Sequence, residues 1–204
     1  MSIQQALLQR REFLLMLAGL SITPVNFAET IMTSDDHVKI NQQASHLDQA
    51  PHAPGKAGDF DFLQGEWKIA HQRPKANSPG EWDHFEGEAT CWSILGGIAS
   101  IEELRIPSRN FSGMGLRLLD REQQVWSDFW VNAKSGVLVS PGVSGGFRNG
   151  VGTFISSEEV EGKTVLFRGM WDQITAHSCR WQQASSKDGG VSWETDWIMH
   201  WRRV

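Results

Sequence analysis

The placement of tryptophan constrains the fold of this 204-residue chain more than any other feature. The chain has ten tryptophans and no tyrosine, and no tryptophan lies in its first quarter. Two sets are evenly spaced, Trp126 with Trp130 and Trp193 with Trp197 and Trp201. Residues at even spacing share one face of a β-strand, and an indole buries a large apolar area with one N–H donor and no acceptor. The body of the chain is therefore predicted to be β-structure with a wide aromatic interior, either fully packed or partly open to a ligand.

Composition and charge limit the classes of partner. The chain has 40% hydrophobic and 21% charged residues, as is usual for a globular protein, and its length allows one ordinary domain with a tail. The formal net charge is −5, from 19 basic and 24 acidic residues, and no basic run or stripe stands out. These features argue against a nucleic-acid partner and against an anionic membrane surface.

The first 28 residues have the pattern of an export signal. Arg10 and Arg11 precede Phe13 and an apolar run that continues through Ile22. A charged start followed by a short apolar core is typical of a secretory signal peptide, and the paired arginines favour the twin-arginine type. The alternative is a chance Arg-Arg pair ahead of an amphipathic helix. The run is too short to span a bilayer, so we expect a periplasmic or secreted mature protein without a membrane span.

The rest of the chain divides into a linker and one domain. Residues 29–58 are rich in polar residues and proline and show no helical or strand period, which indicates a disordered linker. From residue 59 on, short alternating segments separated by turn-forming residues indicate an antiparallel sandwich or barrel. The expected strands are 65–73, 82–94, 98–106, 113–120, 124–131, 136–140, 147–156, 163–172, 177–185 and 191–203. The domain is therefore predicted to be all-β.

Two local features bear on covalent and metal chemistry. Cys91 and Cys179 are the only cysteines, and they either form a disulfide or remain two buried free thiols. Isolated cysteines form no zinc site of the usual kind, and we predict no metal and no cofactor. The run from Ser186 to Trp193 matches the Asp-box pattern S-x-D-x-G-x-S/T-W, which predicts a hairpin turn rather than an active site.

Three motifs carry a resemblance to a known family. The run Phe60–Trp67 reads FDFLQGEW, residues 147–154 read FRNGVGTF, and residues 188–199 read DGGVSWETDWIM. Together they resemble lipocalin-like bacterial domains of unknown function, over about 59–204. The resemblance implies an antiparallel up-and-down, calycin-like β-barrel of about ten strands, and it implies no known reaction.

Candidate site residues are polar groups that share a strand face with large apolar ones. Arg117 shares a face with Leu119, Asp128 with Trp126 and Trp130, and Arg168 with Leu166 and Met170. Buried charges are costly unless they are paired, so such groups indicate either a salt bridge or a polar ligand; the alternative is that these faces point to water. The candidate ligand-binding residues are Arg117, Trp126, Asp128, Trp130, Arg168 and Trp171.

Three functions follow as hypotheses. The first is an exported barrel that binds a small amphipathic or aromatic molecule against its indoles, with the charged residues fixing its orientation. The second is a metal-independent enzyme that uses His71 or Asp128 as acid or base on such a molecule. The third is a haem protein with His200 as axial ligand, because the haem-binding nitrobindins are also small barrels with a histidine near the C-terminus. The oligomeric state stays open.

Overall fold

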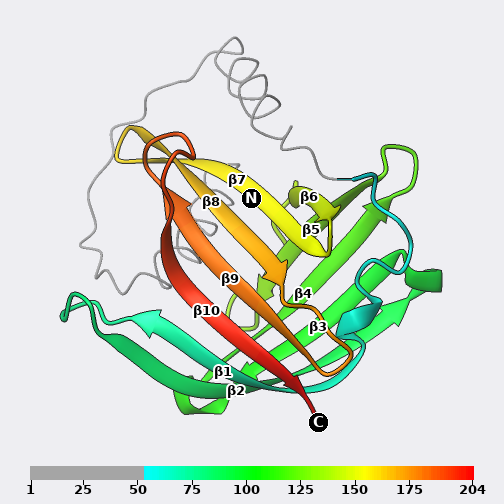
Figure 1. The fold of residues 1–204 in the computed structure, drawn as a ribbon, viewed down its shortest axis with the longest axis horizontal. Helices are drawn as coiled ribbons and strands as arrows, with labels where there is room; N and C mark the ends of the chain where they lie inside the picture. The colour runs from blue at the N-terminus through cyan, green and yellow to red at the C-terminus, as the bar shows by residue number, and fades with distance from the viewer. Residues whose placement is uncertain (1–52) are drawn as a thin grey trace. The chain divides into compact units, whose positions relative to one another are not determined.

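Residues 53–204 form a closed barrel of ten antiparallel strands in the computed structural model (Figure 1). Each strand pairs with its neighbours in sequence, and the last strand pairs with the first, which makes the barrel an up-and-down one. The predicted fold class is confirmed. The predicted signal peptide and the predicted linker up to residue 52 lie outside the described residues.

The strands are β1 (Gly65–Pro74), β2 (Trp82–Ile94), β3 (Ala99–Ile106), β4 (Phe111–Asp120), β5 (Val125–Asn132), β6 (Val143–Arg148), β7 (Val151–Val160), β8 (Lys163–Asp172), β9 (Ser178–Ser186) and β10 (Glu194–Arg203). Three short 3-10 turns accompany them: η1 (Asp61–Leu63), η2 (Leu95–Gly97) and η3 (Pro107–Arg109).

Two of the predicted strands were wrong. Residues 136–140 form no strand, and the sixth strand is β6 at 143–148. The segment 147–156 is not one strand, because a turn at Asn149 and Gly150 separates β6 from β7. Both turn residues have positive φ, 52° and 76°, as a tight two-residue hairpin turn requires.

The alternation of side chains defines the interior of the barrel. In β1, Trp67, Ile69 and His71 are buried while Lys68 and Ala70 between them are exposed. The pairing register then extends this interior face around all ten strands, because residues opposite one another on paired strands point to the same side.

One end of the barrel is plugged by the segment that precedes β1. This segment and η1, drawn in cyan in Figure 1, lie at the end of the barrel where β10 finishes. The Phe60 ring packs edge-on against Trp126 and Phe147, with ring centroids 4.9 and 5.0 Å away. Phe60 and Leu63 are 2% and 0% exposed. These two apolar residues of the run Phe60–Trp67 are thus core residues of the plug.

Hydrogen bonds fix the plug to the barrel wall. The Trp67 indole donates to the Leu63 carbonyl at 2.6 Å, and the Arg203 guanidinium donates to the carbonyls of Phe62 and Gln64. Trp126 Nε1 donates to the Asp59 carboxylate at 3.1 Å. Backbone hydrogen bonds also hold residues 53–58, which the sequence assigned to the linker, against the same end.

The two halves of the interior differ in burial. At the plugged end, Trp67, Trp126, Trp171 and Trp201 are each 2% exposed or less. The opposite half, which we call the open half, has interior-facing aromatic side chains that are only half-buried: Phe85, Phe111, Trp130, Phe167 and Trp181. These four tryptophans are therefore fully buried, whereas the five aromatic side chains of the open half keep part of their surface exposed.

The predicted Asp-box turn is present between β9 and β10. Asp188 accepts hydrogen bonds from the Ser186 hydroxyl and from the amide and hydroxyl of Ser192, at 2.6 to 2.9 Å. These bonds hold the pKa of Asp188 well below its usual range. The Trp193 indole closes the turn by donating to the Gly190 carbonyl. The motif has the structural role expected for it.

Within residues 53–204, no helix is long and apolar enough to cross a membrane.

Candidate functional site

Five of the six candidate ligand-binding residues face the interior of the barrel. Arg117 comes from β4, Trp126, Asp128 and Trp130 from β5, and Trp171 from β8. The register aligns Arg117 with Asp128 across β4 and β5. The two charged candidates on these strands are therefore brought together.

Arg168 does not belong to this group. It pairs with Ile155 and Ala184 on the face opposite to the one that carries Trp171. Its guanidinium lies 4.3 Å from the centre of the Trp193 ring, on the outer surface of the barrel. The expectation that Arg168 lies inside the barrel is wrong, because the residue has the other parity on β8.

A buried carboxylate that the sequence analysis did not single out completes the charged group. Glu102 of β3 accepts a hydrogen bond from Arg117 Nη2 at 2.6 Å, and the two side chains are 4% and 6% exposed. Arg117 Nε lies 3.5 Å from Asp128 Oδ1. Glu102 could have been found from its even spacing with the apolar Leu104 and Ile106. We call Glu102, Arg117 and Asp128 the interior triad.

Aromatic rings cover the guanidinium of the triad on the side of the plug. Arg117 Cζ lies 5.3 Å from the ring centres of both Phe60 and Trp171. Burial alone would lower the pKa of Arg117, but the carboxylates of Glu102 and Asp128 raise it above its usual value. Arg117 Nη1 has no hydrogen-bond partner among the described residues. Phe60 of the plug and Trp171 of β8 thus form the apolar surface that contacts the guanidinium.

Asp128 is the member of the triad that solvent reaches. Its side chain is 24% exposed, although it faces the interior. It is the last residue of β5 that pairs with β6. Burial raises the pKa of Asp128 to about 6, helped by Glu102 and opposed by Arg117. A carboxyl group with this pKa takes up or releases a proton near neutral pH.

Trp130 forms the wall next to Asp128 in the open half. Its ring lies against Gly113 of β4, where a Cβ atom would collide with it. It also lies parallel to the Phe111 ring, with centroids 6.1 Å apart and an interplanar angle of 8°. Glycine on β4 therefore lets the indole lie flat on the wall.

His71, a candidate acid or base, is held in a stack of rings. Trp197 Nε1 donates to His71 Nδ1 at 3.1 Å, and the Phe85 ring is parallel to the imidazole with centroids 4.8 Å apart. Burial, with the nearby charge of Arg73, lowers the pKa of His71 to about 3. The neutral ring therefore carries its proton on Nε2, where a Cβ atom on Gly87 would come within 2.6 Å. No lone pair is left to accept a proton, so this geometry contradicts His71 as a general base.

His200, the candidate haem ligand, lies on the outer surface. It is exposed on β10, where it is aligned with Ala70 of β1 and Arg180 of β9. Its neighbours Met199 and Trp201 face the interior instead. An axial ligand for a haem inside the barrel would need the opposite parity, and the hypothesis fails on this point.

The two cysteines are free and buried. Burial raises the pKa of both thiols, to about 12 for Cys179, and the carboxylate of Glu102 adds to the effect. Both are therefore uncharged and unreactive near neutral pH. Within residues 53–204, no group of three or more His, Cys, Asp or Glu residues is arranged to hold a metal ion.

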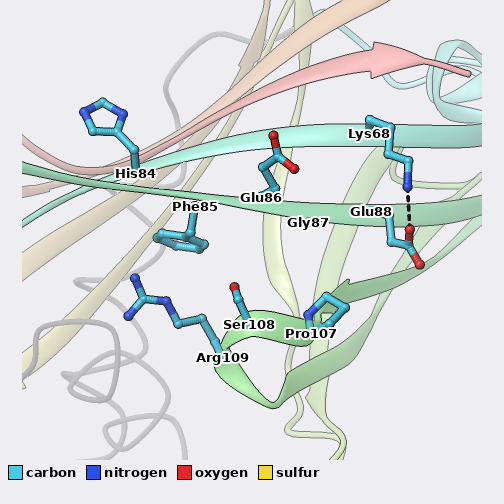
Figure 2. Close-up of a pocket in the computed structure, with 9 residues that line it drawn as sticks. All are labelled: Lys68, His84, Phe85, Glu86, Gly87, Glu88, Pro107, Ser108 and Arg109. Atoms are coloured by element: carbon cyan, nitrogen blue, oxygen red, sulfur yellow. Dashed lines mark hydrogen bonds and ion pairs between the residues drawn. The ribbon is translucent and has the colours of Figure 1, made fainter.

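An open groove of about 700 Å³ lies between β2 and η3 (Figure 2). It follows the part of β2 before Glu88, where pairing with β3 ends. In Figure 2, Phe85 and Arg109 point toward one another across it. The guanidinium lies 4.6 Å from the centre of the Phe85 ring and forms an ion pair with Asp83. Four of its nine lining residues are charged, and it contains none of the candidate ligand-binding residues.

No protein-family model matches the sequence, and no curated protein is similar to it. Among solved structures, the chain is similar to a protein of unknown function from the DUF3598 family of Nostoc punctiforme, at 14% identity and a TM-score of 0.40. The match covers 75% of this chain and 51% of the other, so the chain spans about half the length of that protein.

Proposed function

We propose that this protein is an exported barrel of the lipocalin-like, calycin type that binds a small amphipathic or aromatic molecule in its open half. The observation that carries the proposal is the contrast within one interior. Four tryptophans at the plugged end are 2% exposed or less, whereas Asp128 is 24% exposed and five aromatic side chains beyond it are half-buried. A concave apolar wall with a few convergent polar groups is the usual form of a small-molecule site.

The roles of the residues follow from their positions. Trp130 and Trp181 supply apolar surface for the body of the ligand. Asp128 supplies a hydrogen-bond acceptor that fixes its orientation. Trp126, Trp171 and Arg117 lie on the plugged side, where they hold the site in place rather than contact the ligand.

A neutral fluorescent probe tests this proposal. N-phenyl-1-naphthylamine is titrated into the purified full chain, and its emission is expected to rise on saturable binding. Trp130→Leu is expected to weaken this binding at least about tenfold, equivalent to about 1.4 kcal/mol. Trp193→Leu, which changes an outer-surface indole, is the matched control and leaves binding unchanged. Absence of saturable binding, or equal losses in both variants, contradicts the proposal.

Acid–base catalysis is a second candidate function, which the raised pKa of Asp128 favours. A carboxyl group with a pKa near the working pH is suited to transfer protons. Molecules that co-purify with the protein distinguish the two functions by mass spectrometry. A binder retains them unchanged, whereas an enzyme converts them on incubation, and Asp128→Asn abolishes the conversion.

The proposed export rests on Arg10 and Arg11 ahead of the apolar run. Replacing both arginines with lysine preserves the charge but removes the guanidinium pair. We expect the double variant to stay in the cytoplasm while the parent reaches the periplasm, as measured by fractionation. Unchanged export of the double variant excludes the twin-arginine route.

A further inference from the structure

The interior triad carries one negative charge in excess. Glu102 and Asp128 contribute two carboxylates, and Arg117 contributes the single cation. Glu102 already neutralises the guanidinium through a hydrogen bond of 2.6 Å. Asp128 lies farther away, at 3.5 Å from Nε, and that contact is not a hydrogen bond. Asp128 thus shares one cation with Glu102, and its ion pair with that cation is the longer of the two.

This excess charge has a cost that folding does not require. A carboxylate removed from bulk water is destabilised unless a cation or hydrogen-bond donors compensate it. An asparagine or an apolar residue at position 128 would fill the same place without the charge. A ligand that brings a positive charge would supply a second cation for the two carboxylates of the triad.

Accessibility identifies Asp128, rather than Arg117, as the group that meets a ligand. The Arg117 side chain is 6% exposed and lies against the rings of Phe60 and Trp171, which belong to the plugged end. A ligand acceptor would have to displace the plug to reach it. Asp128 is 24% exposed and needs no such rearrangement. The polar group offered to the open half is therefore an acceptor with negative charge.

The aromatic wall beside Asp128 favours the same kind of ligand. Trp130 lies two residues further along β5, on the same face, and is half-buried. The face of an indole ring attracts ammonium groups, and the attraction increases when the site is partly shielded from water. A carboxylate and an indole face on adjacent interior positions form a combined acceptor for a cation.

We propose that the ligand of the open half is an amphipathic amine whose ammonium group lies between the Asp128 carboxylate and the face of Trp130. This inference rests on the proposed function, because it names the chemical class of the molecule bound there. The apolar body of the amine packs against the remaining aromatic side chains of the open half. An anionic ligand of the same shape is repelled by the excess negative charge of the triad.

Three naphthalene probes of matched shape test the inference in the full chain. They are 2-naphthylmethylamine, 2-naphthalenemethanol and 2-naphthoic acid, measured by isothermal titration calorimetry at about pH 8, where Asp128 is ionised. The amine is expected to bind at least about tenfold more tightly than the alcohol, and the acid is expected to bind most weakly. This comparison uses the unchanged protein and depends on no variant.

Two carboxylate variants then assign the preference to one residue. Asp128→Asn is expected to remove the preference for the amine, so that the ratio of the dissociation constants of the alcohol and the amine falls from at least about ten to about one. Glu103→Gln, on the exposed face of β3, is the matched control and keeps the preference.

The inference is overturned if the alcohol or the acid binds as tightly as the amine, or if Asp128→Asn retains the preference. In either case, binding of N-phenyl-1-naphthylamine shows that the proposed function stands without it. If none of the four probes binds, both the inference and the proposed function fail.

Discussion

Replacement of Arg117 by methionine is expected to destabilise the barrel severely, since it removes the only cation of the interior triad. The side chain is 6% exposed, and its hydrogen bond to Glu102 is 2.6 Å long. Methionine fills a similar volume but leaves Glu102, which is 4% exposed, as an uncompensated buried charge beside Asp128. Loss of one partner of a buried ion pair costs about 3–5 kcal/mol, so we expect a loss of this size in the free energy of unfolding.

The measurement is equilibrium urea denaturation at about pH 7, followed by tryptophan fluorescence. Arg168→Met, on the outer surface, is the matched control and is expected to cost less than about 1 kcal/mol. The double variant Arg117→Met with Glu102→Gln is expected to recover part of the loss, because the stranded charge is gone. Equal losses in the two arginine variants, or no recovery in the double variant, refute the reasoning.

The pH dependence of Arg117→Met gives an independent signature. Without the guanidinium, two like charges remain inside the barrel, and the pKa of at least one of these carboxyl groups rises in the folded state. The folded protein then binds more protons than the unfolded chain, so its stability increases as pH falls from about 8 to about 5. A variant whose stability does not change over this range contradicts the assignment of the loss to stranded carboxylates.

Three further predictions concern single substitutions. Burial raises the pKa of Asp128 from 3.8 to about 6, so the ionised carboxylate lowers the stability of the fold above pH 6 and not at about pH 4. Asp128→Asn is therefore expected to raise the free energy of unfolding by about 1–3 kcal/mol at pH 7 and by much less at pH 4. The measurement is urea denaturation at the two pH values. Phe60→Ala empties the core of the plug and is expected to cost about 3–5 kcal/mol in the same assay, and a loss below 1 kcal/mol contradicts that role. Gly87→Ala places a Cβ atom 2.6 Å from His71 Nε2 and 3.0 Å from the Arg105 carbonyl oxygen, so it is expected to lower the free energy of unfolding by about 1–3 kcal/mol. In Gly80→Ala the new Cβ atom has no neighbour within 4 Å, but the residue has a positive φ, so this variant measures the cost of backbone strain alone.

The strands could be predicted where alternation was regular and turn residues were distinctive. β1, β2 and β8 were located to within a residue, because large apolar and polar side chains alternate between clear breaks. The error around β6 has a physical cause. Gly145 and Gly146 carry no side chain, so they give no alternation, and the strand was assigned instead to the apolar residues of 136–140. A Cβ atom at Gly145 would collide with the Phe154 ring, which explains why this strand has glycine there.

The site could be predicted only in part, because parity on a strand does not tell which face is inside. Arg117 and Asp128 were placed correctly by the large apolar residues that share their face. Arg168 shares its face with Leu166 and Met170 in the same way, but that face of β8 points out of the barrel, where the Trp193 ring lies over the Arg168 guanidinium. Glu102 was overlooked because no aromatic residue marks its strand. Only the pairing register, which sequence does not give, brings the three strands of the triad into alignment.

The closure of the barrel by β10 has a consequence for the order of folding. β1 is flanked by β2, its neighbour in sequence, and by β10, which follows it by more than a hundred residues. Contacts of such long sequence separation slow folding, because the chain must lose the entropy of a large loop before they form. Arg203 at the end of β10 also binds the carbonyls of the plug. During synthesis, neither the pairing of β1 with β10 nor the hydrogen bonds from Arg203 to the plug can therefore form until β10 has left the ribosome.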